Sequence, residues 1–137
     1  MVSACRSRGR SNGRRPPARV EPVHSVLRAS EQRRAANRTL RFEGENHGSG
    51  VSMFLVDNEP GEGPGLHRHP YSETWLVRSG RVRFTADGQD VEAGDGDILV
   101  VGPDTPHKFV NLGPGRLDLV CVHDSPRIIQ EELEAGA

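Results

Sequence analysis

Short apolar or alternating runs, separated by turn residues, dominate the chain from about residue 38 onward. The run 81–86 alternates regularly, with Val82 and Phe84 on one face and charged or polar residues on the other, which is typical of a strand with one buried face. The pair Asp87-Gly88 predicts a tight hairpin directly after it. We expect strands at Thr39–Glu43, Val51–Asp57, Glu73–Arg78, Arg81–Ala86, Gln89–Glu92, Ile98–Val101, His107–Asn111 and Leu117–His123.

Such a succession of short strands predicts an all-β sandwich or barrel. One helix is expected, at Arg127–Glu134, because Ile128, Ile129 and Leu133 fall on one side of it. The run Ile98–Val101 is apolar on both faces, which indicates a buried strand. Its outer face needs a cover, which we expect to be the first strand, the C-terminal helix or a second copy of the chain. A homodimer is the prediction.

The charges divide the chain into two parts, although its net charge is only −1. Residues 1–41 carry 11 Arg and two acidic residues, whereas residues 42–137 carry seven basic and 17 acidic residues. Residues 1–37 have no aromatic residue and too little apolar surface to offset chain entropy, so they are expected to be a disordered tail, within which a short helix at 25–36 is an alternative. Residues 38–137 are expected to form one domain.

The Arg-rich tail allows three interpretations. Clustered Arg is typical of a nucleic-acid-binding arm, but no stacking aromatic residues or binding motif accompany it, so nucleic acid is not an expected partner. A solvated extension is preferred, and an organellar transit peptide is the third option. No apolar run reaches the length of about 18 residues that a membrane helix needs. The two cysteines, Cys5 and Cys121, form no disulfide framework, so a cytoplasmic protein without membrane contact is expected.

Metal-binding residue types gather in one part of the predicted barrel. His67 and His69 are two residues apart, so on a strand their rings project from the same face. Glu73 follows with the parity of His69, and His107 lies on a later strand that can reach the same point from across the barrel. Three imidazoles and one carboxylate suit a divalent first-row metal. Four protein ligands on an octahedral ion leave two positions for water, substrate or oxygen.

The spacing of these residues resembles that of the cupins. Gly61, His67, His69, Glu73 and Gly80 reproduce the first signature of that family without a gap. The second signature matches at the opening Gly, the His and the Asn, here Gly96, His107 and Asn111, whereas Gly102 replaces its Pro and Asp104 its Gly. Asp tolerates a left-handed backbone better than most residues, so we expect the turn to survive.

The resemblance implies a small jelly-roll β-barrel with the metal inside, held by His67, His69, Glu73 and His107. Fe(II) or Mn(II) is favoured, with Ni(II) or Zn(II) as alternatives. Cupins include dioxygenases, isomerases, decarboxylases and lyases, so the resemblance implies a metalloenzyme acting on a small molecule but does not choose its reaction. Three histidines and a carboxylate that leave two coordination positions free suit a dioxygenase-type oxidoreductase, which is the first expectation, with an isomerase or lyase as the second. A non-catalytic cupin that binds or senses a small ligand through its metal is the alternative function.

Further residues near this pattern are candidates for supporting roles. Tyr71 and His123 are candidate acid–base residues. Trp75 and Phe84 are candidate walls of a substrate pocket, and each also fits a plain core position. Asn111 is a candidate substrate contact, although a buried hydrogen-bonding role fits it better. The glycines at 61, 63 and 65 resemble a phosphate-binding loop only superficially, because neither a helix nor a Lys-Ser/Thr pair follows them.

Overall fold

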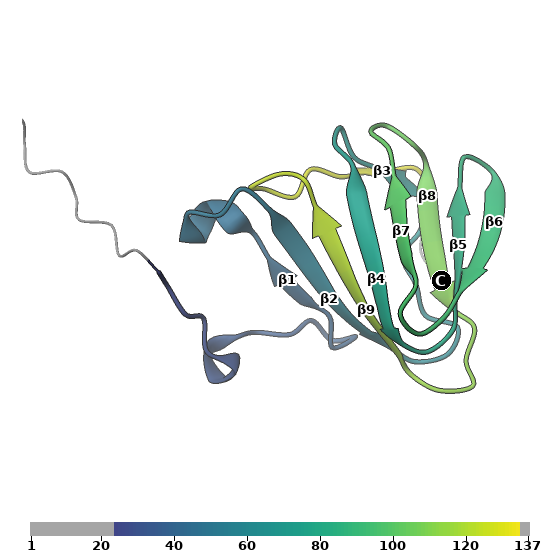
Figure 1. The fold of residues 1–137 in the computed structure, drawn as a ribbon, viewed down its shortest axis with the longest axis horizontal. Coiled ribbons are helices and arrows are strands. Elements are labelled where there is room, and N and C mark those ends of the chain that lie inside the picture. Colours follow the sequence, from purple (N-terminus) through teal and green to yellow (C-terminus); the bar gives the residue numbers. More distant parts are fainter. Residues whose placement is uncertain (1–23, 135–137) are drawn as a thin grey trace, which may run out of the picture.

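The computed structural model describes residues 24–134, which form two five-stranded antiparallel sheets packed face to face (Figure 1). Sheet A consists, in spatial order, of β1 (Leu40–Phe42), β2 (Ser52–Asn58), β9 (Leu117–His123), β4 (Glu73–Ser79) and β7 (Ile98–Val101). Sheet B consists of β10 (Glu131–Glu132), β3 (His67–Arg68), β8 (His107–Asn111), β5 (Val82–Ala86) and β6 (Gln89–Ala93). Two short 3-10 helices, η1 (Ala29–Glu31) and η2 (Gly44–His47), precede β1 and β2. The all-β jelly-roll prediction is confirmed.

The hairpin predicted at Asp87-Gly88 is present and joins β5 to β6. Asp87 and Gly88 have φ values of 50° and 74°, and two successive left-handed residues are what a type I′ turn requires. Ala86 then faces Gln89 directly across the turn. This register places Val82 and Phe84 on the inner face, where both side chains are fully buried.

The core fills the space between the sheets with inward-facing residues from both. Trp75 on β4 and Phe84 on β5 stack across it with ring centroids 4.4 Å apart. Leu117, Leu119 and Cys121 on β9 complete the buried cluster. Burial raises the pKa of the Cys121 thiol, so this cysteine acts as a small apolar residue, as expected.

The prediction that β7 is buried on both faces is wrong, because this strand is the edge of sheet A. The side chains of Ile98 and Val100 on its outer face are 64 % and 68 % exposed. The strand registers align them with outer residues of β4, β9 and β2 in two rows. One row consists of Ile98, Leu76, Val120 and Leu55. The other row consists of Val100, Thr74, Val122 and Met53.

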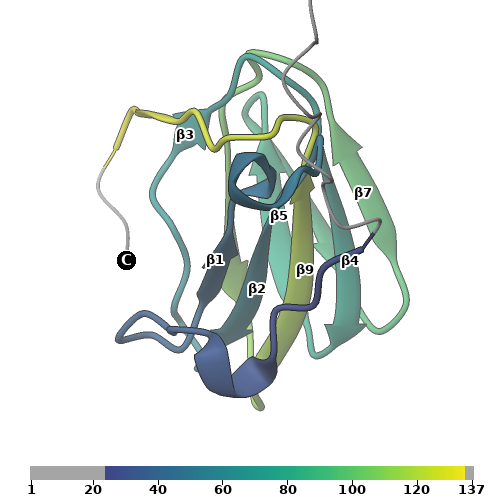
Figure 2. The same cartoon turned by 90° about the vertical axis from the view of Figure 1, so that its left-hand side faces the viewer.

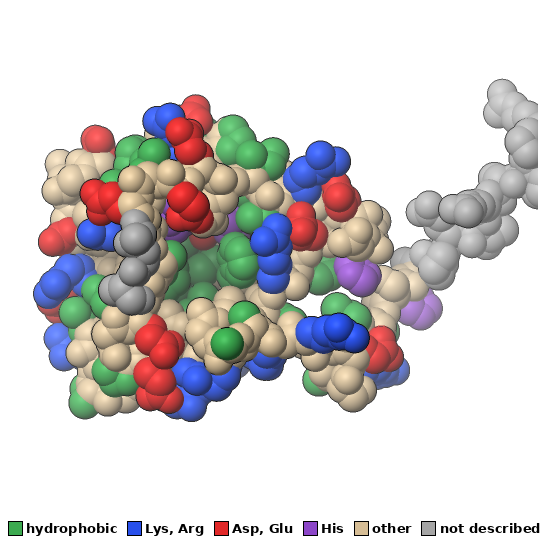
Figure 3. Space-filling model, turned by 180° about the vertical axis from the view of Figure 1, so that it is seen from behind, with side chains coloured by type: hydrophobic (Ala, Val, Ile, Leu, Met, Phe, Trp, Pro, Cys, Tyr) green, Lys and Arg blue, Asp and Glu red, His purple; other side chains and the backbone are tan. Residues whose placement is uncertain are grey.

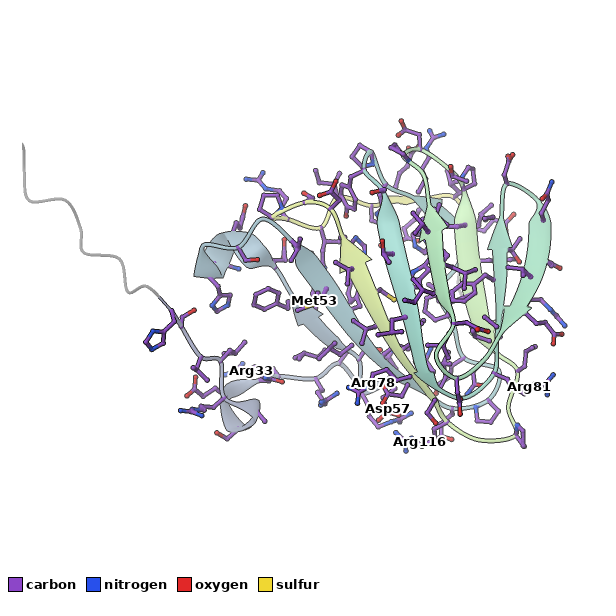
Figure 4. All side chains as sticks on the ribbon, viewed as in Figure 1. Arg33, Met53, Asp57, Arg78, Arg81 and Arg116 are labelled. Atoms are coloured by element: carbon purple, nitrogen blue, oxygen red, sulfur yellow. The ribbon has the colours of Figure 1, made fainter. Side chains whose placement is uncertain are left out.

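A charged row borders this apolar face at one end of the sheet. Asp57 pairs with Arg116 at 2.6 Å, and Arg78 lies 4.0 Å from Asp118. Figure 4 shows Asp57, Arg78 and Arg116 gathered at the lower end of sheet A, with Met53 higher on the same sheet. Among the described residues, the apolar rows are exposed at Ile98, Val100 and Leu76, whereas their other members are partly buried.

The helix expected at Arg127–Glu134 does not form. The segment 126–134 is extended and crosses one end of the barrel from β9 to β3, where it adds the short strand β10 (Figure 2). Its backbone groups bond to the barrel instead of to each other: the N–H groups of Leu133 and Glu134 both donate to Leu66 O. Ile129 and Leu133, the expected apolar face, are 47 % and 39 % exposed.

The N-terminal expectations fall partly outside the described residues, which exclude 1–23 and with them most of the Arg-rich tail. Between residues 24 and 37 the helix considered at 25–36 is reduced to η1. An isolated bridge joins Arg34 to Leu40. Among residues 24–134 the structure contains no helix with the length and apolar character needed to cross a bilayer.

Candidate metal centre

The four residues expected to bind metal meet at one end of the barrel. His67 on β3 is the direct strand partner of His107 on β8, and Glu73 opens β4 in the opposite sheet. His69 is the residue directly after the end of β3. One ligand atom from each of these four buried side chains lies within 4.8 Å of the other three. The structure thus brings together residues up to 40 positions apart in the sequence.

Each of the three histidines is oriented by its Nδ1 atom. This atom lies 2.6 Å from Gly65 O in His67, 2.7 Å from Ile129 O in His69 and 2.8 Å from Thr105 O in His107. A carbonyl oxygen can only accept, so all three Nδ1 atoms donate, and the lone pair of each neutral ring is on Nε2. This is the tautomer in which histidine coordinates a metal through Nε2.

The two carboxylate oxygens of Glu73 have different contacts. Its Oε1 accepts a hydrogen bond of 2.7 Å from the indole nitrogen of Trp75. Its Oε2 lies 3.2 Å from Nε2 of His69 and 2.9 Å from Nε2 of His107. Trp75 was expected in the pocket wall, but its polar atom instead holds a candidate ligand in place.

The unpartnered atoms of this cluster are those that a metal would contact. In the four-residue cluster these three atoms are Nε2 of His69, Nε2 of His107 and Oε2 of Glu73, which are buried and have no hydrogen-bond partner among the described residues; Nε2 of His123, outside the cluster, is unpartnered as well. Leaving buried polar atoms unpaired is costly, and a divalent cation would satisfy all three. The donor set therefore fits a metal.

The protonation states of Glu73 and His67 agree with that fit. Burial alone would raise the pKa of Glu73, but its contacts with His107, His123 and His69 outweigh burial and hold its pKa below the usual range. Burial lowers the pKa of His67. Glu73 is therefore ionised and His67 neutral at neutral pH, which are the forms that bind metal.

A fourth histidine, His123, contacts Glu73 from the other side. It ends β9, is 1 % exposed, and its Nε2 lies 3.1 Å from Oε1 of Glu73. Its Nδ1 lies 2.7 Å from the hydroxyl of Tyr71. That hydroxyl also accepts the N–H of Ile129 at 3.1 Å.

The tautomer of His123 differs from that of the candidate ligands. Burial raises the pKa of Tyr71, so its hydroxyl keeps its proton. The nearest acceptor is Nδ1 of His123, since Nδ1 of His69 is 3.5 Å away and already donates to Ile129 O. Neutral His123 then carries its proton on Nε2, toward Glu73. In that form it is a proton donor beside the cluster.

A cavity of about 200 Å³ adjoins the cluster. Figure 3 shows the molecule hollowed on this face, with apolar and histidine side chains inside the hollow. The wall consists of Asn37, Thr39, Phe54, Val56, Asn58, Gly63, Pro64, His67, Phe109, His123 and Gln130. A candidate ligand, His67, and a candidate acid–base residue, His123, thus face the same space.

Two of the three residues expected to line a pocket are core residues instead. Phe84 is fully buried against Trp75, and neither belongs to the cavity wall. Asn111 also lies behind the wall: its Nδ2 donates to Asn58 O and Gly115 O, and its Oδ1 accepts Gly113 N–H. The buried hydrogen-bonding role of Asn111 is the one that its contacts describe.

Loops shaped by single residues support the cluster. Asp104 adopts a left-handed backbone with φ of 59°, as expected for the turn where it replaces a glycine. Its N–H donates to His69 O at 2.7 Å. Gly63, in the glycine-rich segment, leaves no room for a Cβ, which would collide with the backbone of Phe109. That segment serves as cavity wall, not as a phosphate loop.

Sequence reasoning missed Asn58, which is 3 % exposed and lines the cavity. Within the part of the chain that the structure describes, its Oδ1 has no hydrogen-bond partner. An asparagine at the end of a strand carries no motif, so only the spatial arrangement distinguishes it.

Comparisons with known proteins agree with this geometry. The sequence profile of the cupin domain family matches residues 54–123. A protein of Methanocaldococcus jannaschii, described as uncharacterised, is 36 % identical over 62 residues, which are 44 % of this chain and 50 % of that protein. The present chain therefore matches only half of that relative's length.

Solved structures of oxalate decarboxylase from Bacillus subtilis share the fold. One, described by its Mn(II) centres, has a TM-score of 0.63 at 24 % identity and covers 70 % of this chain and 28 % of its own. An E162A variant of the same enzyme has a TM-score of 0.65 at 22 % identity, covering 74 % of this chain and 29 % of its own. At this identity the likeness concerns the fold.

Proposed function

Because this chain belongs to the cupin domain family, we propose that it binds one divalent transition metal and uses it to act on a small molecule. The proposed ligands are His67, His69, Glu73 and His107, and the proposed substrate site is the cavity beside them. The observation that carries the proposal is the clustering of four buried ligand-type side chains, among which Nε2 of His69, Nε2 of His107 and Oε2 of Glu73 have no hydrogen-bond partner among the described residues.

The residues around that point have separate tasks. The carbonyls of Gly65, Ile129 and Thr105 hold the imidazoles in the coordinating tautomer. Trp75 fixes one oxygen of Glu73 and leaves the other free. A bound divalent ion would supply Lewis-acid or redox chemistry and positions for the oxygen atoms of a substrate. The Mn(II) centres named for the oxalate decarboxylase structure make Mn(II), with Fe(II), the first ions to test.

Tyr71 and His123 are the proposed acid–base pair. They share a hydrogen bond of 2.7 Å, and His123 faces the cavity. Nε2 of His123 lies 3.1 Å from Oε1 of Glu73, and the residue also lines the cavity, which supports a role in moving a proton at the substrate site. Dioxygenase-type oxidation of a small oxygenated compound is our first proposal for the reaction, and isomerase or lyase chemistry is the second.

A non-catalytic, metal-dependent binding module is the alternative function. The same four ligands and cavity would serve it, because both functions need a metal and a small ligand. The two differ in turnover: an enzyme consumes its ligand and loses that ability in His107→Ala, whereas a sensor binds the ligand unchanged.

The deciding experiment is metal analysis of the protein purified without oxygen, beside a His67→Ala/His107→Ala double variant. The native protein is expected to hold about one equivalent of a transition metal, and the double variant none. A His24→Ala variant is the matched control, because His24 is exposed and remote from the cluster. Equal metal content in the native protein and the double variant would remove the proposed site.

We also propose that two copies of the chain associate through the outer face of sheet A. The two rows on that face place seven apolar side chains together, and β7 leaves one edge of the sheet unpaired. An exposed apolar face of this kind is typical of an interface. A twofold axis places the same rows of a second copy against it.

A further inference from the structure

The carboxamide of Asn58 is a buried polar group without a partner in a cavity that has room for a ligand. Asn58 is 3 % exposed, and its Oδ1 has no hydrogen-bond partner among the described residues. The side chain belongs to the wall of the cavity that also contains His67 and His123. Such an oxygen costs free energy unless something donates to it.

The backbone of Asn58 is held firmly, so its side chain is presented from a fixed position. Asn58 pairs with Leu117 across β2 and β9, and its carbonyl accepts Nδ2 of Asn111 at 3.0 Å. Asn111 is in turn fixed by Gly113 and Gly115. Preorganisation of this kind suits a recognition group, because a fixed backbone lowers the ordering cost that binding has to offset.

The strand register separates Asn58 from the candidate metal centre along the cavity. His123, next to Glu73, pairs with Ser52 at the start of β2, whereas Asn58 ends the same strand. Six residues of strand span about 20 Å. Phe54 and Val56 face the cavity between the two ends, and Phe109 faces it from β8. The cavity thus has histidines at one end and the Asn58 amide at the other, with apolar side chains between them, and Asn37, Thr39 and Gln130 add polar groups to its wall.

The chemistry of the wall limits the charge of a ligand. Apart from its histidines, the part of the wall formed by residues 24–134 contains no Lys, Arg, Asp or Glu. Arg38, which lies in the sequence between the wall residues Asn37 and Thr39, is already shared among the carboxylates of Asp57, Glu59 and Glu62, so a second anionic group on the ligand would have to compete with them. A neutral donor, such as a hydroxyl or amide N–H, matches Asn58 instead.

We propose that Asn58 is a specificity-determining residue that accepts a hydrogen bond from the distal end of an elongated small substrate. The substrate class is a slim molecule with metal-binding oxygens at one end, an apolar body, and a neutral hydroxyl or amide at the other. The cavity volume of about 200 Å³ is below the roughly 300–1,000 Å³ of drug-sized ligand pockets, so the body is narrow. This inference rests on the proposed function.

The test uses straight-chain hydroxamates, which chelate divalent metals, as probes of increasing length. Each is compared with counterparts that end in a hydroxyl or in a carboxylate. Affinities are measured by calorimetry on metal-loaded native protein and on Asn58→Leu, which keeps the side-chain volume similar but removes the acceptor. Asn37→Leu is the control, because the Asn37 amide also lines the cavity but its Oδ1 already accepts Thr39 N–H. The metal content of every sample is measured first.

At the chain length that reaches Asn58, the native protein is expected to bind the hydroxyl-ended hydroxamate about tenfold or more tightly than the plain straight-chain hydroxamate (the alkyl probe), as one buried hydrogen bond allows. The carboxylate-ended probe is expected to bind no more tightly than the alkyl probe. Asn58→Leu should lose the hydroxyl preference and retain alkyl binding, while Asn37→Leu keeps both.

The outcomes separate this inference from the proposed function. If metal is present but the hydroxyl preference is absent at every length, or survives in Asn58→Leu, the role of Asn58 is disproved and the metal site stands. A metal-loaded protein that binds no hydroxamate has the same consequence. If the native protein takes up no metal, the proposed function fails and the recognition role of Asn58 fails with it.

Discussion

The indole nitrogen of Trp75 lies 2.7 Å from Oε1 of Glu73, and this hydrogen bond leaves Oε2 as the oxygen that faces His69 and His107. Trp75, a residue of the apolar core, therefore orients the candidate metal ligand Glu73. Because successive inward positions on a strand are two residues apart, Trp75 packs in the core directly beneath Glu73.

Replacing Trp75 by Phe should weaken metal binding more than it disturbs the fold. Loss of a group that orients a metal ligand typically lowers affinity by about 10–100-fold. Affinity is measured by competition with a chelator of known strength. Phe84→Leu is the control, because it perturbs the same aromatic stack without touching Glu73. Equal losses in both variants would assign the effect to packing.

The metal-free protein should lose stability on acidification below about pH 6.5. Burial lowers the pKa of His67 from its ordinary value of 6.5, so the unfolded chain binds a proton at a higher pH than the folded chain does. The free energy of unfolding therefore falls as the pH drops through this window, until the folded protein also takes up the proton. Urea denaturation at several pH values measures it.

The His67→Asn variant should show a shallower decline in the free energy of unfolding over that pH window. A decline near pH 6 that is identical in the native protein and His67→Asn would assign it to other groups.

Glu73 acts at lower pH. Since its pKa is held below the ordinary 4.5, its contribution to the free energy of unfolding is present above about pH 4.5 and is lost as the pH falls toward the pKa of Glu73 in the folded protein.

Deleting residues 127–137 should loosen the site even though none of the proposed ligands is removed. Ile129 accepts Nδ1 of His69 through its carbonyl and donates to Tyr71 through its N–H. We expect metal affinity to fall by about tenfold or more. Deleting only residues 131–137 is the control, since it removes β10 but retains Ile129. If both deletions have the same effect, the contact with Ile129 is not what positions His69.

The double substitution Ile98→Glu/Val100→Glu should convert the proposed dimer to a monomer. It places charges on the exposed apolar rows of sheet A, where association would bury them without partners. Sedimentation equilibrium gives the mass. Val91→Glu is the matched control, because Val91 is 51 % exposed but lies on β6 in the other sheet. A native monomer at micromolar concentration would contradict the proposal.

The strands and the cluster were predictable from sequence because local chemistry and tertiary structure agree there. Asp87-Gly88 turns the chain at the predicted place, and the alternation of Val82 and Phe84 specifies their inward face. His67 and His69 share the spacing that a metal site needs, and His107 reaches them through strand pairing. Each of these features depends on residues close in sequence or on a recognisable spacing.

The C-terminal segment was mispredicted because tertiary contacts outweigh its local preference. Its sequence has helical periodicity, yet the barrel end offers acceptors and donors at Leu66, His69 and Tyr71 that an extended backbone can reach. A helix would have used those backbone groups internally. The edge position of β7 was missed for a related reason, since apolar residues on both faces do not reveal what covers the outer one.

The distribution of the candidate ligands along the chain also bears on how the protein acquires its metal. His67, His69 and Glu73 lie within one short segment, whereas His107 joins them only when β3 and β8 pair. A denatured chain thus retains a partial chelating segment, and any affinity for metal in that state reduces the stabilisation that the ion confers on folding. Refolding in the presence of metal would then capture the ion early, and closure of the β3–β8 pair would slow its escape.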